Sequence, residues 1–402
     1  MARQPRQAVR ATQLGRPHKA GDDEKAGGCL ARMSETLKVI GLMSGTSIDG
    51  IDAALLTTDG EDVAVAGPAL ALPYDPDTRA VLRKVLDDAQ SVARGAPVPY
   101  SIREAERIST EAHARAVSAL LEKARLKPAE ITLIGYHAQT ILHRPEQHWT
   151  WQVGDGALLA RLTGIDVVND FRSADVKAGG QGAPLVPLYH AALVKKTRAL
   201  ELPAVVVNIG GVANVTYISS GAILAFDTGP GNAPIDDWAL RHTGKPIDKN
   251  GALAGAGRVN DVALGKMLAH PFFDRAPPKS LDRLDFTTDA VAQLSPEDGA
   301  ATLTAFTAAA IARSREHFPD PAATWVVCGG GRHNPKLMAE LRARVNAPVL
   351  SAEDAGWRGD FIEAEAFAYL AVRSIRGLPL SLPTTTGVRQ PMTGGRLHKA
   401  RG

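Results

Sequence analysis

Apolar residues occur along this chain in short blocks that alternate with polar, glycine-rich turns. The blocks "LKVIGLM" (37–43) and "IDAALLTT" (51–58) have the length and the branched residues typical of buried strands. Between them the chain packs Gly, Ser, Thr and Asp into a few positions, which predicts either a plain turn or a loop that holds phosphate. Five further blocks have a similar form, a strand followed by polar or glycine-rich residues: 131–140, 164–170, 202–219, 223–240 and 324–345.

Helical periodicity marks three further segments. Residues 75–90 and 101–124 carry apolar residues three and four positions apart, and the second begins with the spacing of a capping box over Ser101–Glu104. A last helix over 362–376 is ended by a glycine and a proline. Strands that alternate with helices in this way indicate an α/β architecture.

One pattern occurs twice. The stretches "KVIGLMSGTSIDGIDAALL" and "VVVNIGGVANVTYI" both predict hairpins with a turn of small residues, and Gly45 and Gly210 within these turns are 165 residues apart. The similarity is too weak to prove a duplication. It predicts two domains of related design, each of which presents one glycine hairpin to a shared cleft.

Composition and charge exclude several classes of protein. The 402 residues are 45% hydrophobic and 22% charged, as expected of a globular protein with a substantial core. The two ends, 1–32 and 384–402, carry a formal charge of +4 each, so that 33–383 carry −5. A mildly acidic middle with basic ends does not predict the clustered basic surface of a nucleic-acid-binding domain. No apolar run approaches the roughly 18 residues of a membrane span, and two cysteines define neither a disulfide framework nor a zinc site.

The two ends of the chain differ from the middle in pattern as well. Residues 1–36 are basic at first and contain no apolar segment of the kind found in secretory signals, so we expect a disordered extension before the fold begins. The stretch that follows Met33 is typical of the beginning of a folded domain. For 384–402 we expect a flexible tail.

Four places in the sequence could cradle phosphate, because glycine lets backbone N–H groups approach a ligand closely. They are Ser44–Ser47, Gly210–Gly211, Gly229–Asn232 and Gly329–Gly331. Taken singly, each is more often a tight turn, and none matches the Walker or G-x-G-x-x-G patterns. The prediction rests on finding all four directly after buried strands, where ligands gather in α/β sheets.

Two carboxylates also follow strands. A lone Asp in this place is usually a turn or helix cap, which is the plain reading of both Asp170 and Asp227. Asp170 is the stronger candidate for catalysis, because Arg172, Asp175 and a glycine-rich stretch follow it at once. Such a polar segment within a core pattern is typical of a functional loop.

A third polar cluster begins in the last residues of the block 131–140, which starts as a buried strand, and continues just beyond it. It contains His137, Gln139, His143 and Arg144. No Cys or carboxylate completes a metal site there, so hydrogen bonding to a polar ligand is the better interpretation, and a surface loop is the plain alternative.

Together these segments resemble one family closely, that of anhydro-N-acetylmuramic acid kinase. The resemblance spans about 37–376 and rests on these stretches: "GLMSGTSIDGID", "GYHAQTILHRP", "WQVGDGALLARLTGIDVVNDFRSADVKAGGQGAPLVP", "NIGGVANVTYI", "FDTGPGNAPIDDW", "CGGGRHNPKLM" and "GDFIEAEAFAYLA". It implies an α/β fold of two related actin-like ATPase (ribonuclease H-like) domains that flank an ATP cleft. We expect domain I at 37–145, completed by a C-terminal helix at about 364–380, and domain II at 146–363.

The resemblance also implies a reaction, in which ATP, water and 1,6-anhydro-N-acetylmuramic acid give N-acetylmuramic acid 6-phosphate and ADP. The internal bridge of this sugar ties O6 to C1, so water must attack C1 while O6 departs with the γ-phosphoryl group. The family acts in the cytoplasm during peptidoglycan recycling and uses ATP with Mg²⁺. A homodimer is implied, with no nucleic acid and no membrane as partner.

Residue roles follow from the same resemblance. Asp170 is implied to be the general base and Glu363 to lie near the site of phosphoryl transfer. The implied nucleotide-binding residues are Ser44, Gly45, Thr46, Ser47, Asp49, Gly50, Asp52, Asn208, Gly210, Gly211, Gly329, Gly330, Gly331 and Asn334. The candidates for binding the sugar are His137, Gln139, Arg172, Gly180 and Asp227. The strand before the first loop lacks the acidic residue that often anchors magnesium in this fold, so we assign no metal ligand.

Two alternatives remain at this point. An ordinary amino-sugar kinase on the same fold would use Asp170 to deprotonate a free hydroxyl, and it would phosphorylate N-acetylglucosamine or N-acetylmuramic acid. A nucleotide-gated binding module would hydrolyse ATP without any sugar.

Overall fold

The computed structural model describes residues 35–45, 47–62, 64–281 and 286–401. These belong to one compact unit that begins at Thr36, apart from Glu35. The predicted basic extension therefore lies almost entirely outside the described residues. Within the described ranges, no helix has both the length and the apolar composition needed to cross a membrane.

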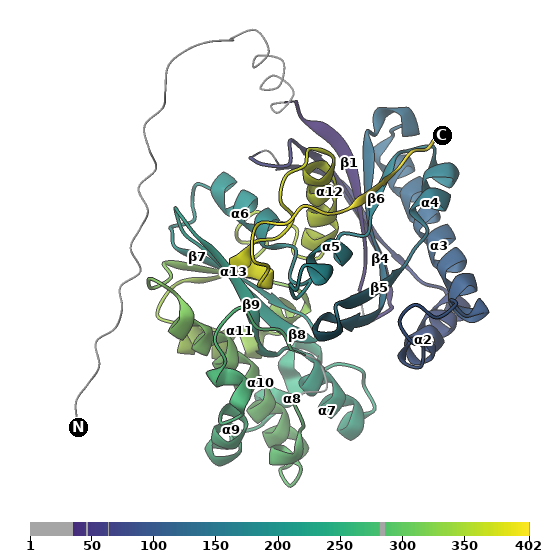
Figure 1. The fold of residues 1–402 in the computed structure, drawn as a ribbon. Helices are drawn as coiled ribbons and strands as arrows, with labels where there is room; N and C mark the ends of the chain where they lie inside the picture. The colour runs from purple at the N-terminus through teal and green to yellow at the C-terminus, as the bar shows by residue number, and fades with distance from the viewer. Residues whose placement is uncertain (1–34, 46, 63, 282–285, 402) are drawn as a thin grey trace, which may run out of the picture. The chain divides into compact units, whose positions relative to one another are not determined.

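The first half of the chain, together with β12 near the C-terminus, builds a seven-stranded sheet in the order β12-β6-β4-β1-β2-β3, with β5 paired to β4 (Figure 1). Strands β1, β2 and β3 are antiparallel neighbours, whereas β4 and β6 run parallel to β1. The strands are β1 (Leu37–Ser44), β2 (Gly50–Thr58), β3 (Ala64–Pro73), β4 (Leu133–Arg144), β5 (Trp149–Val153), β6 (Val167–Asn169) and β12 (Arg396–His398).

The second sheet repeats this arrangement in the order β11-β10-β7-β8-β9. Again three consecutive strands are antiparallel and the next two join in parallel beside the first of them. The strands are β7 (Ala204–Ile209), β8 (Val212–Ile218), β9 (Ile223–Pro230), β10 (Thr324–Cys328) and β11 (Val349–Ser351). The same strand order in both sheets confirms two related α/β halves, and the turns at Gly45 and Gly210 occupy the same position in each.

Helices cover both faces of the sheets. Helices α2, α3 and α4 pack on the outer face of the first sheet, and α10 and α11 pack on the outer face of the second. Helices α6 and α12 lie between the two sheets in one continuous apolar cluster. The helices are α2 (Pro76–Gln90), α3 (Tyr100–Ala124), α4 (Gly156–Thr163), α5 (Ser173–Lys177), α6 (Pro187–Lys196), α7 (Ala233–Thr243), α8 (Ala252–Ala256), α9 (Asp261–Leu268), α10 (Pro296–Arg313), α11 (Pro335–Arg344), α12 (Ile362–Ile375) and α13 (Pro383–Thr386).

Helix α12 lies unusually close to the first sheet. A Cβ atom added to Gly41 in β1 would lie 1.7 Å from the carbonyl oxygen of Ala364, and one added to Gly135 in β4 would lie 2.0 Å from that of Phe367. Only glycine permits this approach, because it has no Cβ. The two glycines therefore fix the position of α12 and of the residues at its start.

The structure differs from the sequence predictions in three places. Helix α3 begins at Tyr100 after Pro99, without a side-chain cap, so the predicted capping box at Ser101 is wrong. Strands β5 and β6 pair within the first sheet, although the predicted boundary at 145 assigned them to the second domain. Strand β12 pairs with β6, so that the segment expected to be a flexible tail adds a strand to the sheet.

Candidate active site

The end of β1 and the turn that follows it are held by side chains of β4 and of the loop after β3. The Ser44 hydroxyl donates to Gln139 Oε1 at 2.6 Å and accepts from the Tyr74 hydroxyl at 2.9 Å. Gln139 Nε2 in turn donates to the carbonyl oxygen of Gly45 at 3.2 Å. Ser44 and Gln139 are both buried, so they shape the first loop instead of facing a ligand. Thr46 lies outside the described residues.

A β-bulge in β4 lies at His137 and Ala138, between residues that keep the regular pairing with β1. Leu42 pairs with Tyr136 and Ser44 pairs with Gln139, so two residues of β4 oppose one of β1. The extra residue arises where Ala138 adopts a left-handed φ of 63°. Such bulges re-aim side chains and are frequent beside active sites. Here His137 points to α12, where its ring lies 4.4 Å from that of Phe367.

Carboxylates of the first hairpin and of the segment around the start of α12 lie near enough to influence one another. Burial, and after it the negative charges of Asp49, Glu363 and Asp360, raise the pKa of Asp52 to about 7. Asp49 itself accepts a hydrogen bond from the Ser47 hydroxyl at 2.9 Å. This excess of negative charge would be relieved by a cation. Within the described ranges, however, no three His, Cys, Asp or Glu side chains are placed to hold a metal ion alone.

Glu363, in the first turn of α12, connects the two halves of the site. Its Oε1 accepts a hydrogen bond from Asn208 Nδ2, at the end of β7, at 3.4 Å. Burial raises the pKa of Glu363, whereas the nearby Arg172 guanidinium and the Asn208 bond lower it. Glu363 thus interacts with one residue from each half of the chain.

Arg172 is anchored on two sides. Its Nε and Nη2 lie 3.1 and 2.9 Å from His137 Nε2, and its Nη1 donates to the carbonyl oxygen of Gly182 at 2.7 Å. Burial lowers the pKa of Arg172 to about 10, which still leaves it charged near neutral pH. Burial and the Arg172 charge hold the pKa of His137 well below its usual value, so His137 is the neutral acceptor of this pair.

Asp170 follows β6 directly and is exposed. Its φ of 56° lies in the left-handed region, which is costly for a residue other than glycine. The preceding Asn169 fixes the strand end, since its Oδ1 lies 2.9 Å from His398 Nε2 and its Nδ2 donates to the carbonyl oxygen of Gly154. A strained, exposed carboxylate on a well-anchored strand end is typical of functional positions.

The glycine turns of the second half lie against one another. The backbone N–H of Asn232 donates to the carbonyl oxygen of Gly210 at 2.7 Å, and a Cβ on Gly329 would lie 2.3 Å from Asn208 Oδ1. These glycines serve two purposes. Space for a ligand to approach remains at Gly45, Gly210, Gly211 and Gly330, whereas neighbouring atoms fill the space at Gly50, Gly329 and Gly331.

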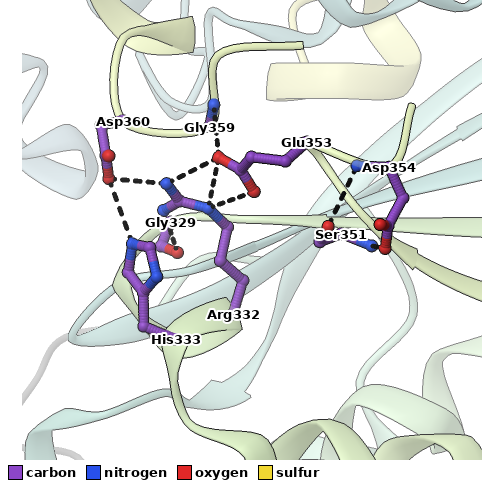
Figure 2. Close-up of polar contacts among 8 residues, drawn as sticks. All are labelled: Gly329, Arg332, His333, Ser351, Glu353, Asp354, Gly359 and Asp360. Atoms are coloured by element: carbon purple, nitrogen blue, oxygen red, sulfur yellow. Dashed lines mark hydrogen bonds and ion pairs between the residues drawn. The ribbon is translucent and has the colours of Figure 1, made fainter. Parts of the chain in front are cut away.

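A buried arginine ties the Gly329 loop to the segment before α12 (Figure 2). The Arg332 side chain is only 2% exposed, and its Nη1 donates to the carbonyl oxygen of Gly329 at 2.9 Å. Its Nη2 lies 2.9 Å from a carboxylate oxygen of Glu353 and 2.8 Å from one of Asp360. Asp360 also lies 3.5 Å from His333 Nε2. This network holds one glycine turn beside the start of α12.

Three predicted ligand residues have local partners. The Asn334 side chain accepts from the N–H groups of Lys336 and Leu337, so it caps α11. Asp227 accepts from the Leu281 N–H at 2.9 Å, and burial raises its pKa to about 7. Gly180 packs against the Asp175 carboxylate. These three residues therefore have structural roles, and the ligand contacts predicted for them remain predictions.

Sequence reasoning did not select Tyr74, Arg332 and Asp360, although the latter two stand inside motifs that carried the family resemblance. A charged residue beside a triple glycine was a usable signal for Arg332. Tyr74 gave none, because its contact with Ser44 joins residues 30 positions apart.

Comparison with known proteins agrees with this arrangement. Residues 37–400 match the profile of the family described as anhydro-N-acetylmuramic acid kinase. The chain is 53% identical over 363 residues to the protein of that name from Paramagnetospirillum magneticum, covering 89% of this chain and 99% of the relative. For the Agrobacterium fabrum protein of the same name the identity is 51% over 373 residues, covering 92% and 100%.

A solved structure of a ROK family glucokinase from Streptomyces griseus is similar over 83% of this chain and 98% of its own, with 13% identity and a TM-score of 0.38. The fold assignment rests instead on the repeated strand order of the two sheets. By its family profile and by the identity to these relatives, the chain belongs to the anhydro-N-acetylmuramic acid kinase family.

Proposed function

We propose that this chain opens 1,6-anhydro-N-acetylmuramic acid with water and transfers the γ-phosphoryl group of ATP to O6, giving N-acetylmuramic acid 6-phosphate and ADP. The observation that carries the proposal is the meeting of both halves at Glu363. Asn208 of the second half bonds this carboxylate, and Asp52 and Arg172 of the first half interact with it electrostatically. Family membership supplies the substrate.

Asp170 is proposed as the general base. The sugar has no free hydroxyl at C6, so the base must activate water for attack on C1 while the C1–O6 bond breaks. Departing O6 takes the γ-phosphoryl group, and the proton from water passes to the base. An exposed carboxylate can reach such a water, and the anchored end of β6 holds Asp170 in its left-handed conformation.

Arg172 and His137 are proposed to bind the sugar. The guanidinium is held by Gly182 and His137 and keeps further N–H donors in a fixed fork. A neutral His137 does not compete with it for an anionic substituent such as the lactyl carboxylate. Gly180, Gln139 and Asp227 are proposed to shape the loops around the sugar.

The glycine turns are proposed to hold the phosphates of ATP. Space beside the Cα atoms of Gly45, Gly211 and Gly330 would let a phosphate approach the backbone there, whereas the Gly210 N–H already donates to the carbonyl oxygen of Val212 at 3.2 Å. The Ser47 hydroxyl would donate to phosphate only after giving up its bond to Asp49. Phosphoryl transfer depends chiefly on such positioning and on neutralising charge.

Magnesium fits the residues beside the first hairpin. Asp49, Asp52, Asp360 and Glu363 carry the hard oxygen donors that Mg²⁺ prefers. The pKa of Asp52 is raised first by burial and then by the negative charges of the other three. When bound, the ion would neutralise charge on the phosphates. Because Mg²⁺ is usually held by one or two carboxylates together with phosphate oxygens, a complete protein cage is not needed.

The setting that we propose follows from the family. The enzyme would work in the cytoplasm, in the recycling of peptidoglycan, as a homodimer.

The test is the mass of the product formed from ATP, Mg²⁺ and 1,6-anhydro-N-acetylmuramic acid in ¹⁸O-labelled water. A phosphorylated sugar with one labelled oxygen supports the proposal. Release of ADP without a sugar product favours the nucleotide-gated module. Faster phosphorylation of N-acetylglucosamine or N-acetylmuramic acid favours an ordinary amino-sugar kinase.

Asp170→Asn tests the base, because the amide cannot accept the proton. Turnover should be abolished while ATP still binds, whereas Asp261→Asn, at the exposed start of α9, should leave turnover unchanged. Turnover of Asp170→Asn near the wild-type rate would remove Asp170 from this role.

A further inference from the structure

Asp175, in the short helix α5, is a buried carboxylate with three neutral hydrogen-bond donors. It is 2% exposed. It accepts from the Gly182 N–H at 2.6 Å, from the Thr386 hydroxyl at 2.6 Å and from the Ser381 hydroxyl. A buried charge is tolerated only when hydrogen bonds replace water in this way. Asp175 therefore joins the loop after α5 to the C-terminal segment around α13.

The C-terminal segment, residues 381–388, closes over that loop. The Gln181 N–H donates to the carbonyl oxygen of Thr386 at 2.7 Å. A Cβ on Gly180 would lie 2.2 Å from Asp175 Oδ1 and 2.5 Å from Val388 Cγ1. The loop is thus held between Asp175 on one side and the C-terminal segment on the other, with no room for a side chain at Gly180.

Gly182 connects this clamp to the sugar side of the site. Its N–H is bonded to Asp175, and its carbonyl oxygen accepts from Arg172 Nη1 at 2.7 Å. Any shift of Gly182 therefore moves the acceptor that fixes one edge of the Arg172 guanidinium. His137 holds the other edge.

We propose that Asp175, clamped by the C-terminal segment 381–388, is a positioning residue that sets the orientation of Arg172 through Gly182. The proposal rests on the proposed function insofar as Arg172 binds the sugar. It assigns a role in the site to a segment that lies more than 200 residues from Arg172 in the sequence. From the C-terminal segment the effect passes through three hydrogen bonds, which join Thr386 to Asp175, Asp175 to Gly182 and Gly182 to Arg172, and it does not require contact with either substrate.

The test compares substitutions that remove or keep one hydroxyl group. Thr386→Val keeps the volume of the buried side chain but removes its bond to Asp175, whereas Thr386→Ser keeps the hydroxyl. Thr304→Val is the matched control, because Thr304 is equally buried but bonds only the Ala300 carbonyl within α10. Asp175→Asn tests the acceptor itself.

We expect Thr386→Val to raise the KM for the sugar about tenfold and to leave the KM for ATP within twofold, since a hydrogen bond to a charged group contributes roughly this much. Thr386→Ser should stay within twofold of the wild type for both. An equal change in both KM values, or an unchanged sugar KM in a variant that is less stable to heat, would overturn the proposal.

A second measurement does not depend on the identity of the substrate. The NMR signal of the Arg172 Nε–H, assigned by its loss in Arg172→Lys, should shift and exchange faster with water in Thr386→Val and Asp175→Asn. It should stay unchanged in Thr304→Val. If the wild type phosphorylates no anhydro sugar, the proposed function fails, but this signal still tests the positioning role of Asp175. An unaltered signal in both Thr386→Val and Asp175→Asn would overturn that positioning role.

Discussion

Substitution of Gly41 by alanine tests whether the close approach of α12 to the first sheet sets the geometry of the site. The added Cβ would lie 1.7 Å from the carbonyl oxygen of Ala364 and 2.8 Å from the backbone nitrogen of Ala368. Both atoms are backbone, so neither can swing away as a side chain could. Ordinary contact begins at 3.4 Å, and α12 must therefore retreat by about 1.7 Å at Ala364.

Two effects of this retreat can be estimated. Overpacking of a well-packed core typically costs about 1–3 kcal/mol of unfolding free energy. The second effect falls on Glu363, which precedes Ala364 directly and would be displaced relative to Asn208. Because a misplacement of about 1 Å can cost on the order of 100-fold in rate, we expect kcat to fall by about that factor.

The assay measures kcat with saturating ATP and sugar, together with the unfolding free energy in urea. Gly265→Ala in α9 is the control: nothing lies within 4 Å of its added Cβ, and alanine favours a helix interior by about 1 kcal/mol over glycine. The control should be more stable and fully active. Wild-type kcat and stability in Gly41→Ala would refute the reasoning.

The same displacement predicts a non-additive pair. Gly135→Ala also presses on α12, at the carbonyl oxygen of Phe367. Once one substitution has moved the helix, the second meets less resistance. The double variant should therefore lose less stability than the sum of the two single variants, and strict additivity would show that the two glycines do not act on a common helix position.

Three further predictions follow from buried polar groups. Arg332→Met removes the hydrogen bond that holds the Gly329 turn, so it should raise the KM for ATP several-fold and change the KM for the sugar little. Equal shifts in both KM values would contradict this. Tyr189→Phe should lower the unfolding free energy measured in urea by about 1.5–3 kcal/mol, because the hydroxyl donates to the buried Glu365 carboxylate at 2.7 Å. A decrease below about 0.5 kcal/mol would count against this buried hydrogen bond. Burial lowers the pKa of His190 to about 3 from 6.5, so the unfolded chain binds the extra proton as pH falls below 6.5. The unfolding free energy of the wild type relative to His190→Gln should then drop by about 1.4 kcal/mol per pH unit towards pH 3, and a constant difference between pH 7 and 4 would refute it.

Local patterns in the sequence were sufficient for many of the elements, although β3, α6 and α10 were not predicted. Runs of branched apolar residues marked the strands, and the repeated hairpin marked two related halves, because strand composition and glycine turns act over a few neighbouring residues. Helices predicted at 75–90 and 362–376 occur at Pro76–Gln90 and Ile362–Ile375. The roles proposed for Asp170 and Glu363 remain predictions.

Other features were decided only by the tertiary structure. Strand β12 has three residues and no periodicity of its own, so its place depends on the free edge that β6 offers. The same holds for the clamp on Asp175, which joins residues over 200 positions apart, and for Arg332, whose carboxylate partners lie 21 and 28 positions away. The predicted boundary at 145 missed β5 and β6 for this reason. Hydrogen bonds and close backbone approaches between distant segments leave no local periodicity, so only the folded chain reveals them.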